Sequence, residues 1–177
     1  MKKGLIGNLL PDYRFKNLIG IDAVLFSGSG LIIFDVDNTL VFPETTETKA
    51  EVIEWFKEMK KEHRCLCLSN SRTISKREKR ISQVFDCEFF LSKNKKPSKK
   101  LFKEIKKKFS FPCSEIVVVG DRVFSDILFG NRSGATTILV EPLTCKEKIL
   151  TKIFRKTENF IIHCLKPFVK NAQKNRS

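Results

Sequence analysis

The sequence predicts an α/β domain built on a parallel, doubly wound sheet. Short apolar runs typical of strands alternate along the chain with longer segments whose apolar residues recur at helical spacing. The run Ile116–Val119 is apolar at every position, which in such an alternation indicates a strand buried on both faces. Five such strands separated by helices favour parallel pairing. With 177 residues and 41% hydrophobic content, the chain is long enough for one domain of this kind.

Residues 1–30 are expected to form an N-terminal extension that packs on the core. They lack the long apolar core and the small-residue cleavage site of a secretory signal. The first predicted strand, residues 31–34, runs directly into Asp35 and Asp37. In open α/β sheets, chemistry gathers beyond the carboxyl ends of the strands, so this position suits a pair of catalytic carboxylates. A strand end followed by an aspartate-rich turn is the ordinary alternative.

The remaining elements follow from the spacing of apolar residues. The predicted helices are residues 48–63, 74–85, 97–109 and 123–131, and the predicted strands are residues 64–69, 88–91, 116–119 and 136–140. Pro97 suits a first helical turn. Beyond Pro142 the pattern is helical only, so residues 143–177 are expected to form a basic amphipathic tail. That tail either packs on the core or lies in a membrane interface.

The net charge of +14 indicates an anionic partner, and residues 93–108 alone carry nine lysines and one acid. Nucleic acid, an acidic lipid surface and a phosphorylated substrate all satisfy this charge. No window has the roughly 18 apolar residues that a bilayer-spanning helix needs. A cytoplasmic protein, or one peripheral at the membrane, is therefore expected. Six cysteines without a C-x-x-C motif favour buried free thiols over disulfides or a zinc site.

Polar side chains suited to phosphoryl chemistry follow the later strands in order. Ser69 and Asn70 close the second apolar run, and Lys96 precedes the third helix. Asp121 follows the strand at 116–119, and Asp126 comes five residues later. Each has an ordinary alternative, because serine and asparagine cap helices, aspartates favour helix starts, and most lysines are solvated.

With D-V-D-N-T-L, S-N-S, K-K-P and G-D-R-V-F-S-D in this order, the chain resembles the haloacid dehalogenase (HAD) superfamily of phosphotransferases. It is most similar to the class IIIA branch, which contains the YqeG-like proteins and the mitochondrial phosphatidylglycerophosphate phosphatases. The resemblance implies a Rossmann-like five-stranded sheet in the order 5-4-1-2-3. Because residues 41–50 leave no room for an inserted domain, the core at 31–142 is expected to be capless.

The resemblance also implies a Mg²⁺-dependent phosphomonoesterase. Asp35 would be the nucleophile that forms an aspartyl phosphate, and Asp37 the general acid and base. The Asp35 carboxylate, the Asp37 backbone carbonyl and Asp121 would bind the metal, since Mg²⁺ prefers hard oxygen ligands.

The other motif residues would hold the phosphoryl group. Ser69 and the backbone of Asn70 would donate hydrogen bonds to its oxygens, and Lys96 would neutralise its charge. Asp126 would hold water or Lys96 beside the metal.

A capless site stays open and suits a large or surface-presented substrate. The leading expectation is phosphatidylglycerophosphate or a related anionic phospholipid, with peripheral membrane contact through the basic face. One alternative is a phosphatase for nucleotide, polynucleotide or phosphoprotein substrates. The other is a basic RNA-binding or assembly module on the same fold.

Overall fold

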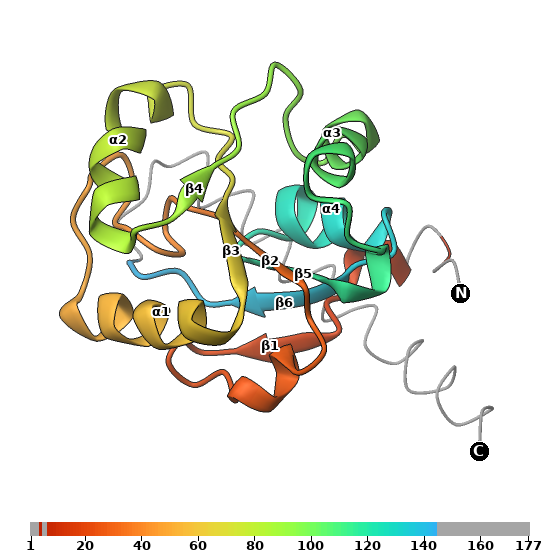
Figure 1. The fold of residues 1–177 in the computed structure, drawn as a ribbon, viewed down its shortest axis with the longest axis horizontal. Helices are drawn as coiled ribbons and strands as arrows, with labels where there is room; N and C mark the ends of the chain where they lie inside the picture. The colour runs from red at the N-terminus through yellow and green to blue at the C-terminus, as the bar shows by residue number, and fades with distance from the viewer. Residues whose placement is uncertain (1–3, 5–6, 145–177) are drawn as a thin grey trace.

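The computed structural model describes residue 4 and residues 7–144, so the predicted tail lies outside the described residues from position 145 onward. Its centre is a six-stranded sheet in the order β1-β6-β5-β2-β3-β4, and every pairing is parallel (Figure 1). The strands are β1 (Tyr13–Phe15), β2 (Leu31–Phe34), β3 (Arg64–Cys67), β4 (Glu88–Phe89), β5 (Ile116–Gly120) and β6 (Thr136–Val140).

The five predicted strands occur in the predicted order 5-4-1-2-3, but the predicted number of strands was wrong by one. The additional strand, β1, comes from the N-terminal extension and pairs with β6. The carboxylate of Asp12 accepts hydrogen bonds of 2.9 Å from both the backbone nitrogen and the hydroxyl of Thr137, which fixes the entry to β1. A strand of three residues is too short to show an alternation of apolar and polar side chains, so its pairing with β6 and not its local sequence defines it.

Four α-helices connect or follow the strands. They are α1 (Ala50–Glu62), α2 (Ile74–Phe85), α3 (Lys99–Phe109) and α4 (Leu128–Asn131). Three 3₁₀ turns, η1 (Gly7–Leu9), η2 (Ala23–Phe26) and η3 (Cys113–Glu115), and one π-helical turn, η4 (Val123–Ile127), complete the described elements. The expectation that Pro97 opens a helix was wrong: Ser98 caps α3, its hydroxyl accepting a hydrogen bond of 3.2 Å from the backbone of Lys100.

Helices cover both faces of the sheet (Figure 1). On one face α1 and α2 pack against β2 through an aromatic group that includes Phe34, Phe56 and Phe85. On the other face α3 and α4 pack through Phe102 and Phe129, whose ring centroids lie 5.3 Å apart. β5 contributes buried valines to both layers, as expected for a central strand.

The cysteines within the described residues are free thiols. Cys65, Cys67 and Cys87 are buried and Cys113 is partly exposed. Burial raises the pKa of Cys65 to about 12, so this thiol stays protonated at neutral pH.

The segment from β2 to α1, residues 35–49, contains no helix or regular strand, in keeping with a core that lacks an inserted cap. Over the residues described here, no helix combines the length and the hydropathy needed to cross a membrane.

Candidate active site

The carboxyl ends of β2, β3 and β5 meet at one edge of the sheet. Asp35 directly follows β2, and its backbone nitrogen donates a hydrogen bond of 2.8 Å to the carbonyl of Val119 in β5. Asp121 directly follows β5, and Ser69 lies two residues beyond β3. The strand ladder therefore carries these side chains to a common edge, as the sequence order predicts.

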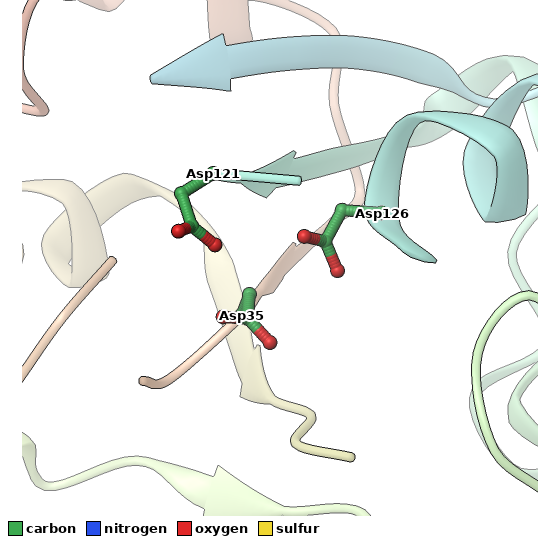
Figure 2. A group of neighbouring side chains, drawn as sticks. All are labelled: Asp35, Asp121 and Asp126. Carbon is green, nitrogen blue, oxygen red and sulfur yellow. The ribbon is translucent and has the colours of Figure 1, made fainter. Parts of the chain in front are cut away.

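Three aspartates form a compact carboxylate cluster. Figure 2 shows Asp121 and Asp126 turned toward Asp35, and one carboxylate oxygen from each lies within 4.8 Å of the others. Asp126 comes from the π-helical turn, and its Oδ2 accepts a hydrogen bond of 3.1 Å from the backbone of Arg122. A Cβ at Gly120 would lie 2.4 Å from the Asp126 Cγ, so this approach requires glycine.

Lys96 is a buried member of this site. Its Nζ lies 2.5 Å from the Asp35 Oδ1 and 2.6 Å from the Asp126 Oδ1, and it donates a hydrogen bond of 3.0 Å to the carbonyl of Leu68. Only 1% of the side chain is exposed, so the alternative of a solvated surface lysine is wrong. Burial lowers the pKa of Lys96, but the Asp126 and Asp35 carboxylates outweigh it and leave the pKa raised. The ammonium is therefore charged at neutral pH.

Negative charge is in excess at the cluster. The pKa of Asp35 is raised, mainly by burial; Lys96 opposes this shift, whereas the Asp126 and Asp121 carboxylates add to it. Three carboxylates face one ammonium, and carboxylate oxygens are the ligands that Mg²⁺ prefers. The donor set therefore fits a divalent cation.

Asn70 holds the backbone of Lys96. Its Nδ2 donates a hydrogen bond of 2.8 Å to the Lys96 carbonyl, and its Oδ1 accepts one of 2.9 Å from the Lys96 nitrogen. These paired bonds fix the lysine beside the end of β3. The sequence predicts a role for the Asn70 backbone at the site, but it does not indicate that the Asn70 side chain holds Lys96.

Asp37 lies beside the cluster and is held by several donors. The Ser69 hydroxyl donates a hydrogen bond of 3.2 Å to its Oδ2, and the backbone of Glu44 donates one of 2.8 Å to its Oδ1. Arg77 approaches both oxygens with Nη2, at 2.9 and 3.1 Å. Sequence reasoning missed Arg77, although a signal exists: it lies three residues after Ile74 and four before Ile81, on the apolar face of α2.

Comparisons with known proteins agree with this architecture. The sequence model of the mitochondrial PGP (phosphatidylglycerophosphate) phosphatase family matches residues 8–144. The chain belongs to this family. It is thus a phosphatase of the HAD type, which confirms the resemblance drawn from the motifs. The roles of individual residues stay predictions.

Relatives of the family differ in how much of their length this chain matches. The probable phosphatase YqeG of Bacillus subtilis is 34% identical over 159 residues, which cover 89% of this chain and 91% of that protein. The chloroplastic/mitochondrial phosphatidylglycerophosphate phosphatase 1 of Arabidopsis thaliana is 29% identical over 161 residues. That match covers 85% of this chain but 46% of the plant protein, so the chain spans about half of the plant protein's length.

A solved structure has a similar fold. An uncharacterized protein from Listeria monocytogenes serotype 4b superimposes with a TM-score of 0.53 at 20% sequence identity. The superposition covers 68% of this chain and 84% of the Listeria chain.

Proposed function

We propose that this chain is a Mg²⁺-dependent phosphomonoesterase that hydrolyses phosphatidylglycerophosphate, or a related anionic phospholipid, through an aspartyl phosphate. The observation that carries the proposal is the meeting of Asp35, Asp121 and Lys96 at the ends of β2 and β5. Two relatives carry the name phosphatidylglycerophosphate phosphatase, and this supports the lipid substrate.

The metal would be held by the Asp35 carboxylate, Asp121 and the backbone carbonyl of Asp37. Asp126 would remain paired with Lys96, whose Nζ lies 2.6 Å from the Asp126 Oδ1. When bound, Mg²⁺ would neutralise charge that develops on the phosphoryl oxygens.

The chain's own residues divide the reaction into two steps. Asp35 attacks phosphorus and the bond to the leaving oxygen breaks, while Asp37 gives that oxygen a proton. In the second step Asp37 takes a proton from water, which attacks the aspartyl phosphate, releases inorganic phosphate and restores the Asp35 carboxylate. Lys96 would stabilise the phosphoryl oxygens in both steps. The Ser69 hydroxyl, which donates to Asp37 in the structure, would donate to a phosphoryl oxygen when substrate is bound.

Positive charge near the site supports an anionic lipid surface as the place of action. In parallel βαβ units, a helix begins at the sheet edge where the preceding strand ends, so the starts of α2 and α3 lie on the active-site edge. The exposed basic residues at or just before these starts are Arg72, Lys76, Lys93, Lys95, Lys99 and Lys100. Each basic residue near an anionic leaflet contributes about 1 kcal/mol of attraction.

The first experiment measures Mg²⁺-dependent phosphate release from phosphatidylglycerophosphate in mixed micelles. Asp35→Asn should abolish turnover, whereas Asp86→Asn, at the exposed end of α2, should leave it unchanged. Equal activity in Asp35→Asn would refute the assigned nucleophile. Faster turnover of soluble nucleotides or phosphopeptides than of the lipid would overturn the lipid assignment and favour the alternative substrates.

A second experiment measures binding to vesicles containing anionic phospholipid. The double variant Lys93→Glu/Lys95→Glu should bind at least about 30-fold more weakly, because losing two lysines removes about 2 kcal/mol. The matched control is Lys57→Glu/Lys107→Glu, which changes exposed lysines in the second halves of α1 and α3, toward the opposite edge. Equal binding by the two double variants would argue against docking through the active-site edge.

A further inference from the structure

We infer that Arg77 is a positioning residue that holds Asp37 in the orientation from which it protonates the leaving group. The inference rests on the proposed function, because it takes Asp37 as the general acid. It adds to that function a residue that none of the sequence motifs contains.

The guanidinium of Arg77 joins Asp37 to two other segments. Nη2 contacts both carboxylate oxygens of Asp37, at 2.9 and 3.1 Å, and lies 3.3 Å from the Ser71 hydroxyl. Nη1 donates a hydrogen bond of 2.5 Å to the carbonyl of Thr45, in the segment between β2 and α1. One side chain from the first turn of α2 therefore ties together the segments that follow β2 and β3.

The stability of the fold does not by itself explain an arginine at this position. Its side chain is 10% exposed and lies between buried Ile74 and Ile81 on the face of α2 that packs on the sheet. Burying a charged pair commonly stabilises a protein less than an apolar replacement would. Within residues 7–144, the buried Arg77 Nε also has no hydrogen-bond partner. Both Nη atoms make hydrogen bonds, to Asp37 and to the carbonyl of Thr45, whereas Nε makes none in this part of the chain. The side chain is therefore placed for its contacts with Asp37 and Thr45 and not for full pairing of the guanidinium.

The other donors to Asp37 cannot replace this contact. Ser69 and the backbone of Glu44 each donate one neutral hydrogen bond, from two different segments. Arg77 supplies the charged donor, and charge-assisted hydrogen bonds are roughly twice as strong as neutral ones. Its loss would leave Asp37 present but less precisely oriented.

The leaving group makes this role measurable. The alkoxide that leaves an alkyl phosphate is a strong base and needs a proton in the transition state, whereas p-nitrophenolate is a weak base and leaves without one. General acid catalysis contributes about 10²–10⁴-fold when the proton is needed. A defect in positioning Asp37 therefore falls mainly on alkyl phosphates.

The experiment measures kcat and KM for phosphatidylglycerophosphate and for p-nitrophenyl phosphate. Arg77→Met should lower kcat on the lipid by about 100-fold and on the aryl phosphate by less than about tenfold, with KM nearly unchanged. Arg77→Lys should recover part of the loss, because it keeps a charged donor. In the Asp37→Asn background, Arg77→Met should cause little further loss, since both changes act on one step. Arg80→Met, an exposed position on the same helix, is the matched control.

Three results would overturn the inference: an equal fall in kcat on both substrates, a rise in KM as the main effect, or additive losses in the double variant. Urea unfolding of Arg77→Met and Arg77→Lys separates lost folding from lost positioning, because a merely structural role lowers both activities in proportion to folded protein. If Asp37→Asn itself shows no dependence on the leaving group, the part of the proposed function that makes Asp37 the general acid fails. If Asp37→Asn shows that dependence and Arg77→Met does not, only this inference fails.

Discussion

Replacing Lys96 by methionine should strongly destabilise the protein when divalent metal is removed. Lys96 is 1% exposed and contacts Asp35 and Asp126 at 2.5 and 2.6 Å. Asp126 is 0% exposed, so water cannot take over from the missing ammonium. Removing one partner of a buried ion pair costs about 3–5 kcal/mol, a large part of the roughly 5–15 kcal/mol that stabilises an ordinary domain.

The assay is urea unfolding in the presence of a chelator. With a denaturant dependence of about 2 kcal/mol per molar, a loss of about 4 kcal/mol moves the midpoint down by about 2 M. Lys96→Met/Asp126→Asn should recover part of that shift, since the second change removes the more buried of the two carboxylates that lose their ammonium partner. Lys95→Met, at the exposed neighbouring position, serves as the control. A midpoint for Lys96→Met equal to that of Lys95→Met would refute the reasoning.

Two further predictions concern the same edge of the sheet. Because the pKa of Asp35 is raised above its ordinary value of 3.8, the folded protein holds this proton to higher pH than the unfolded chain does. Without metal, the free energy of unfolding should therefore fall as the pH rises above 3.8, and it should fall more for the unmodified protein than for Asp35→Asn. Urea midpoints that change in parallel for the two proteins from pH 4 to pH 8 would contradict this. Gly120→Ala should lower stability by about 1–3 kcal/mol and reduce phosphatase activity, because its Cβ would meet the Asp126 Cγ at 2.4 Å. Gly4→Ala, with no atom of the described chain within 4 Å of its Cβ, is the control in thermal unfolding, and equal midpoints for the two glycine variants would count against the crowding argument.

The sequence could predict which residues gather at the site because the strands of a parallel sheet all end at the same edge. The strand order that the family resemblance implied also places β2 between β3 and β5. Together these two points put Asp35, Ser69 and Asp121 near one another. The apolar periodicity was strong for β2, β5 and the first three α-helices, and these elements lie within a few residues of their predicted bounds.

What the sequence could not show depends on contacts between distant segments. The use of the Asn70 side chain to hold Lys96 requires the segment before α3 to lie beside the end of β3. The contact of Arg77 with Asp37 depends on how α2 packs over the loop after β2. β1 forms only because β6 offers a partner, and its three residues carry no pattern of their own.

The position of β1 has a consequence for strand addition at the margins of the sheet. It pairs with residues 138–140, the last three residues of the mostly buried five-residue strand β6, and covers their backbone groups on that side. At the opposite margin, β4 has only two residues, one of them the charged Glu88. Neither margin offers a long apolar template onto which a second chain could add a strand. Truncation through residue 16 would uncover β6 and create an aggregation-prone surface in an otherwise protected sheet.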